Sequence, residues 1–212
     1  MEMLAGKNNT IAKPVAASDL DKRIDKKLDI VAKIFADAIG SRWKETISSF
    51  FSKELVLKGC RYLKEMQLNY RCENRFFSRS YNLEMRTEIF TKEMLQKPGD
   101  CVFQVQSKGR LSIRDAEWVC KEFHGKDEDK NAYLARLNNR LIIDRIVALD
   151  MTRVSVSHQA DSDKWIISCE SMVGSATWIL IPPVTSLIKP NPEECVKVIE
   201  FFELTADALL HP

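Results

Sequence analysis

The segment from Met151 to Pro183 restricts the possible folds most, because its side chains alternate with a period of two residues. In its first half, Val154, Val156 and His158 alternate with Ser155 and Ser157. A polar turn at Asp161-Ser162-Asp163 separates this strand from a second one that begins at Trp165. This pattern predicts antiparallel strands with one buried face.

The end of the same segment has a different pattern. Ala176 to Ile181 is almost wholly apolar, follows Gly174 and is ended by Pro182-Pro183. A short apolar run bounded by turn residues is typical of a strand that is covered on both faces. We therefore expect this strand to lie at the centre of the sheet.

Two further strands are predicted nearer the N-terminus. Polar and apolar residues alternate from Leu68 to Glu73 and again from Tyr81 to Ile89. The connection between them is expected at Asn74 to Ser80, although Phe76 and Phe77 are unusually apolar for a turn.

Helices are predicted at both ends of the chain. Ser18 and Asp21 resemble a capping box, and apolar residues then recur every three or four positions from Leu20 to Ala38. Asn191 and Pro192 mark the start of a long last helix. Its apolar arc is wide enough to contact two surfaces, within the fold or in a dimer.

Three more helices are expected inside the chain. Ser41 begins a second N-terminal helix that carries Phe50 and Phe51, and Ser112 to Asp115 begins a short helix that continues to Phe123. An apolar stripe from Tyr133 to Leu149 indicates another helix, interrupted in its middle by Asn138-Asn139.

These elements predict an α+β fold in which helices pack on a predominantly antiparallel sheet. Cystatin-like and helix-grip folds share this outline, a likeness of architecture that carries no function. We expect a flexible N-terminal tail at residues 1–17, where no periodicity is present, and a single domain at residues 18–212.

Composition limits the cellular setting. The 212-residue chain has a formal net charge of only +2, too small to imply a nucleic-acid or membrane partner by itself. No run approaches the ~20 apolar residues of a membrane span, and we expect no membrane partner. The six cysteines form no CxxC pair and no signal peptide is recognisable, so we expect reduced thiols and a cytoplasmic protein.

Catalytic and metal sites find little support. His158 is in phase with a core face, and the strand register places Cys169 nearer Ser155 than His158. Cys120 and His124 are spaced as two ligands on one helix face, but no matching pair completes a zinc site. We therefore predict no catalytic residue, no metal and no cofactor.

The segment from residue 53 to residue 86 supplies the best binding candidates. It holds eight Lys or Arg against four acidic residues, interleaved with aromatic side chains. Basic groups beside aromatic rings suit phosphate contact and base stacking. Alternation, however, directs Tyr70 and Arg71 to opposite faces. The candidate binding residues are Arg71, Arg75, Phe76, Phe77, Arg79 and His158.

The leading hypothesis is a non-catalytic binding or assembly module with a protein partner or with self-association. The alternative is a nucleic-acid-associated protein that uses the 53–86 segment, and an enzyme of unrecognised class is third. The identity of the ligand or partner does not follow from these residues.

Overall fold

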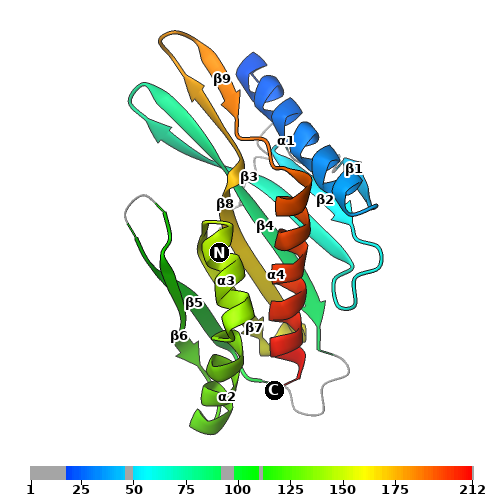
Figure 1. Cartoon of the computed structure of the whole chain (residues 1–212), viewed down its shortest axis with the longest axis vertical. Helices are drawn as coiled ribbons and strands as arrows, with labels where there is room; N and C mark the ends of the chain where they lie inside the picture. The colour runs from blue at the N-terminus through cyan, green and yellow to red at the C-terminus, as the bar shows by residue number, and fades with distance from the viewer. Residues whose placement is uncertain (1–17, 46–49, 92–97, 110–111, 212) are drawn as a thin grey trace, which may run out of the picture.

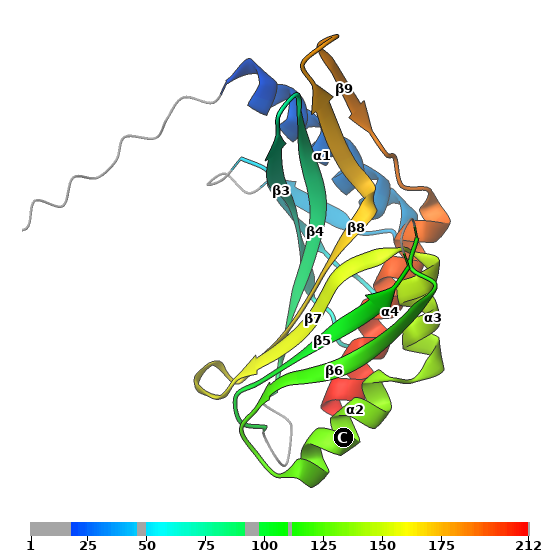
Figure 2. The ribbon, with the colours of Figure 1, turned by 90° about the vertical axis from the view of Figure 1, so that its left-hand side faces the viewer.

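A computed structural model describes residues 18–45, 50–91, 98–109 and 112–211. The predicted tail at residues 1–17 lies outside the described residues. In the described part, one antiparallel sheet carries helices on one face, as Figures 1 and 2 show. The predicted α+β class is therefore confirmed.

The sheet contains nine strands within the described residues and runs in the order β1-β2-β3-β4-β8-β7-β5-β6, with β9 also paired to β8. The bounds are β1 (Arg42–Glu45), β2 (Ser52–Val56), β3 (Glu65–Arg75), β4 (Ser78–Phe90), β5 (Cys101–Lys108), β6 (Asp115–Phe123), β7 (Met151–Gln159), β8 (Lys164–Ile179) and β9 (Val184–Leu187). The long strands β4 and β8 lie side by side at its centre and connect its two halves.

Four α-helices are described: α1 (Asp19–Ala38), α2 (Asp127–Leu137), α3 (Arg140–Ala148) and α4 (Pro192–Leu210). A short 3-10 turn at Ala160–Ser162 joins β7 to β8. α4 runs along the covered face and contacts each of the other three helices (Figure 1). The buried apolar residues between helices and sheet form one cluster.

Both predicted end helices are confirmed, and their caps explain where they begin. The Ser18 side chain accepts a hydrogen bond from the Asp21 N–H, and the Asp21 carboxylate accepts one from the Ser18 N–H. Asn191 and Glu194 form the same reciprocal pair at the start of α4. These bonds satisfy backbone donors that a helix start leaves unpaired.

The predicted second N-terminal helix is wrong. Residues Arg42–Glu45 form strand β1, which pairs with β2, while Ile47 lies outside the described residues. The Ser41 hydroxyl accepts a hydrogen bond from the Lys58 N–H and caps no helix. Pairing with a neighbouring strand has overridden a weak local helix pattern.

The helix predicted to begin at Ser112–Asp115 and continue to Phe123 is also wrong, because residues Asp115–Phe123 form strand β6. Ala116 and Trp118 are buried, and Glu117 between them is exposed. This alternation was masked in the sequence by apolar residues that also recur at helical spacing.

The helix predicted from Tyr133 to Leu149 is divided at Asn138 into α2 and α3. The Asn138 side chain accepts a hydrogen bond from the Trp118 N–H at 2.8 Å and donates one to the Trp118 C=O at 3.1 Å. Asn138 therefore acts like a short partner strand for β6, which ends the sheet on that side.

Candidate docking surface

Two hairpins of the sheet end close together and form the candidate surface. Phe76 and Phe77 make the turn between β3 and β4, which closes at the pair Arg75 and Ser78. The turn between β8 and β9 follows the pair Ile179 and Val184. Both turns lie at the upper end of the molecule in Figures 1 and 2.

A backbone hydrogen bond connects the two turns. The Leu180 N–H donates to the Phe77 C=O at 2.9 Å, directly beyond the pairing of Ser78 with Ile179. We define the arm tip as Phe76, Phe77 and residues Ile179 to Val184. The tip is thus one surface made from two distant parts of the chain.

Apolar side chains at the arm tip are exposed to solvent. Phe76 is 92% exposed, Phe77 58% and Ile181 74%. The two phenylalanine rings pack edge to face with their centroids 4.6 Å apart. Ile179, Leu180 and Val184 are also exposed. Contiguous exposed apolar surface of this kind marks interaction sites in soluble proteins.

Within the two hairpins themselves, the charges have one sign. Residues 74–83 and 171–192 contain Arg75, Arg79 and Lys189 and no acidic residue. The Arg79 guanidinium lies over the Trp178 ring, 5.8 Å from its centroid. The apolar tip is therefore flanked by positive charge.

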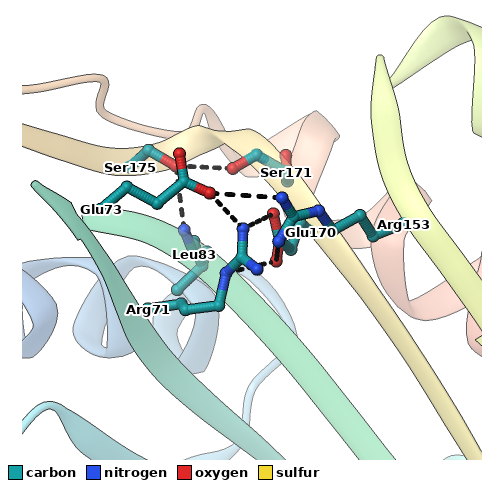
Figure 3. Close-up of polar contacts among 7 residues, drawn as sticks. All are labelled: Arg71, Glu73, Leu83, Arg153, Glu170, Ser171 and Ser175. Atoms are coloured by element: carbon teal, nitrogen blue, oxygen red, sulfur yellow. Dashed lines mark hydrogen bonds and ion pairs between the residues drawn. The ribbon is translucent and has the colours of Figure 1, made fainter. Parts of the chain in front are cut away.

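A set of hydrogen bonds holds β8 against β3 and β4 below the tip. The Tyr70 hydroxyl donates to the Gly174 C=O at 2.7 Å. The Ser175 hydroxyl donates to the Ser171 C=O at 2.6 Å and accepts from the Leu83 N–H at 2.9 Å, as Figure 3 shows in part. They occur where the pairing of β4 and β8 shifts register, so they stabilise an irregular part of the sheet.

Beside these bonds, four charged side chains form an ion-pair cluster on the helix-free face (Figure 3). Arg71 on β3 binds Glu73 and also Glu170 on β8, with its Nε 2.8 Å from Glu170 Oε1. Arg153 on β7 contacts the same two carboxylates at 3.2 and 3.3 Å. The cluster links three strands across β4.

The Glu170 side chain is only 9% exposed within this cluster. Burial raises the pKa of Glu170, Arg71 lowers it, and the nearby Glu84 and Glu73 raise it further. Two guanidinium groups and two carboxylates nevertheless satisfy each other here. We interpret the cluster as structural support for the base of the hairpins.

The structure brings four of the predicted binding residues together. Arg75, Phe76, Phe77 and Arg79 lie at or beside the arm tip. Arg71 instead takes part in the ion-pair cluster. His158 is buried against Trp165, with its ring centroid 5.1 Å from that of Trp165, and Nδ1 lies 3.2 Å from the Gly99 C=O.

The prediction for Ala176 to Ile181 was wrong in one respect. β8 is central, but its end leaves the covered region, so Ile179 and the turn after it are exposed. These residues were missed as site candidates because their apolar character indicated burial. The Pro182-Pro183 pair, which marks a turn, was the available signal.

The structure gives less support to the other candidate sites. Cys120 and His124 are on or just after a strand, and His124 contacts Glu122 at 3.0 Å. Within the described residues, no three His, Cys, Asp or Glu side chains gather to hold a metal ion. A surface groove of ≈ 340 Å³ between α3 and α4 has charges that already pair, Arg145 with Glu200 and Lys197 with Glu193.

Among the helices that the structure describes, none combines the length and apolar character needed to cross a bilayer. Comparison with curated proteins and with solved structures found no match. A family model described as "Protein of unknown function (DUF3156)" matches residues 44–209, which include every strand and helix from β2 to β9 together with most of α4. The chain therefore belongs to this family of proteins of unknown function.

Proposed function

We propose that this protein is a non-catalytic binding module that docks onto a protein partner through the arm tip. The observation that carries the proposal is the gathering of exposed apolar side chains on two hydrogen-bonded turns. Aromatic side chains at the centre of an interface supply much of the energy of protein association.

The free energy expected from burying the exposed side chains of the arm tip favours docking. Removing a fully exposed Phe side chain from water contributes about 1.5–3 kcal/mol, so Phe76 and Ile181 alone form a useful anchor. The hydrogen bonds and ion pairs at the base of the hairpins support the tip before any partner arrives. Such preorganisation lowers the entropy that binding must lose.

We also propose that the protein works in the cytoplasm. All six cysteines lie in the described residues, and all six are free thiols. Free thiols are the usual state in a reducing compartment, which supports this location.

Nucleic-acid association is the alternative, and the geometry supports it less. Arg71 is already neutralised by two carboxylates, while Tyr70 and Tyr81 are buried and cannot stack on bases. A nucleic-acid site would depend on Arg75 and Arg79 beside Phe76 and Phe77. Fluorescence anisotropy with a labelled single-stranded oligonucleotide tests this, because binding must fall steeply with salt. No binding at low salt removes the alternative.

The proposed docking is tested by placing a photo-crosslinking amino acid at Ile181 in the full chain, in cells that naturally produce it. We expect a discrete protein adduct on irradiation. Leu141 is the matched control, since it is an exposed apolar residue on α3, away from the arm tip. A crosslinker at Leu141 is expected to give no such adduct.

A second variant separates specific docking from chance contact. Phe77→Glu places a charge in the arm tip and is expected to remove the Ile181 adduct while leaving the unfolding midpoint unchanged. An adduct of twice the chain mass identifies self-assembly through the tip. The absence of any adduct at Ile181, or equal adducts at Leu141, contradicts the proposal.

A further inference from the structure

Strand β9 has an open edge beside the arm tip. Within the described residues, β9 pairs only with β8. Ile188, directly after β9, directs both its backbone groups toward β8: its N–H donates to the Ser175 C=O at 3.0 Å and its C=O accepts from the Gly174 N–H at 2.7 Å. In an antiparallel pair such groups alternate along the strand. The N–H and C=O groups of Thr185 and Leu187 therefore point away from β8.

The β6 edge, which lies on the same side of β8 as β9, shows how this fold closes an edge. There, the Asn138 side chain occupies both the N–H and the C=O of Trp118 on β6. No hydrogen bond between described residues occupies the outward groups of Thr185 or Leu187. β9 itself reads Val-Thr-Ser-Leu and lacks the charges and prolines that protect edge strands.

The side chains around this edge suit one kind of ligand. Val184 and Ile188 are exposed on the same face as Ile179, so an added strand would find apolar neighbours. Lys189 follows the edge directly, Arg79 lies on β4 with β8 between it and β9, and positions 171 to 192 contain no acidic residue. Charge complementarity therefore favours an apolar segment that carries acidic residues.

We infer that the open edge of β9 binds an extended, apolar and acidic segment of the partner protein as an added β-strand. The inference rests on the proposed function and specifies the partner's chemistry and its binding mode. Backbone hydrogen bonds to Thr185 and Leu187 supply affinity, and side-chain contacts with Ile188 and with the arm tip, which includes Val184, supply selectivity.

A second copy of the chain fits this edge less well. Two β9 edges paired with each other would offer Lys189 no acidic partner, because residues 171–192 contain no acidic residue. An interface between two such edges therefore lacks complementary charge. The edge therefore favours a different protein.

The inference is tested by selecting displayed random 12-residue peptides against the full chain and measuring their affinities by fluorescence polarisation. We expect the selected peptides to combine Val or Ile with Asp or Glu. Thr185→Pro removes an outward N–H but no bond to β8, and should weaken binding at least tenfold. Thr185→Val, which keeps that N–H, is the matched control and should change affinity less than twofold.

A second measurement leaves the protein unchanged. Methylating the backbone nitrogens of a selected peptide one at a time should abolish binding at alternate positions only, because every second amide of an added strand faces β9. Uniform tolerance of methylation overturns strand addition, as does equal binding by Thr185→Pro and wild type.

Other results overturn the inferred partner. Failure to select any peptide, or selection of basic peptides, contradicts an apolar and acidic segment. Dimers that Thr185→Pro disrupts in sedimentation velocity would identify a second copy of the chain as the partner. Co-sedimentation with phosphatidylserine vesicles that Thr185→Pro reduces would identify a membrane surface. If Ile181 still crosslinks to a protein while Thr185→Pro has no effect on that adduct, strand addition fails and docking through the arm tip stands.

Discussion

At the scale of single residues, Lys53 is a buried charge that is paired with two carboxylates. Its side chain is 2% exposed, and its Nζ lies 3.0 Å from Asp25 Oδ2 and 2.9 Å from Asp29 Oδ1, both on α1. Burial lowers the pKa of Lys53, but hydrogen bonds to Asp29 and Asp25 outweigh burial and raise it above its ordinary value. Lys53 therefore attaches β2 to the first helix as a cation.

Replacing Lys53 by Met should destabilise the protein by about 3 kcal/mol, because two carboxylates lose their buried partner. Asp25 also accepts the Phe51 N–H, so the loss extends to the start of β2. Lys22→Met is the matched control. Lys22 pairs with Asp19 in full solvent and should change stability by less than about 1 kcal/mol. Urea unfolding measures both, and equal effects would show that Lys53 acts only as a surface charge.

Within the candidate surface, the residue-level prediction named only residues in or beside the β3–β4 turn. Arg75, Phe76, Phe77 and Arg79 were identified because aromatic and basic residues stand together in a turn. Ile179 to Val184 were not, since apolar residues in a row indicate burial until a structure shows otherwise. Exposure is a property of the neighbours that a side chain finds, and those neighbours are distant in sequence.

At the scale of elements, β8 depends on Gly174, the point below the arm tip where the sheet becomes irregular. Gly174 has a φ of +87°, and a Cβ there would lie 2.5 Å from Leu83 Cδ2 and 3.3 Å from Val31 Cγ1. The residue thus combines a left-handed backbone with close packing against β4 and α1.

Gly174→Ala should therefore destabilise the protein more than Gly59→Ala. Gly59 has a similar φ of +76°, but a Cβ there would meet nothing within 4 Å. Backbone strain costs roughly 1–2 kcal/mol in both variants, and overpacking adds about 1–3 kcal/mol at Gly174 alone. The difference between their free energies of unfolding isolates packing. Equal values would mean that Leu83 and Val31 move aside freely.

The elements also show where local patterns mislead. The pattern after Ser112 resembled a helix because apolar residues recurred at both spacings, whereas pairing with β5 made it a strand. Asn138 interrupted an apparent helix because its side chain pairs with β6, twenty residues earlier. In both cases a contact beyond the local window decided the element.

At the scale of the whole molecule, one core encloses three cysteines whose thiols resist ionisation. Burial raises the pKa of Cys101 and of Cys195 to about 12, and also raises the pKa of Cys169. In the unfolded chain these thiols ionise with the ordinary thiol pKa of about 9.0. Between about pH 9 and pH 12, the folded protein therefore binds more protons than the unfolded chain.

Stability should consequently fall as pH rises above about 9 and be independent of these thiols well below that value. Each thiol contributes a slope approaching about 1.4 kcal/mol per pH unit. Urea unfolding from pH 7 to pH 10 measures the total slope. Cys101→Ala lowers the free energy of unfolding at pH 7 because it leaves a cavity. Above about pH 9, however, the free energy of unfolding of this variant should fall less steeply with pH, because one of the three thiols is missing. An unchanged slope would contradict a buried, neutral Cys101.

The amino-acid sequence by itself determined the fold class, both end helices with their caps, and the antiparallel strands around Asp161. These features depend on hydrogen bonds and side-chain periodicity within a few residues, which any reader of the sequence can evaluate. Only the tertiary structure decided the order of the strands, the closure of the β6 edge by Asn138, and the meeting of Phe77 with Leu180 more than a hundred residues later. Those outcomes depend on which distant segments pack together and which side chains are left in solvent, and local physical preferences do not contain that information.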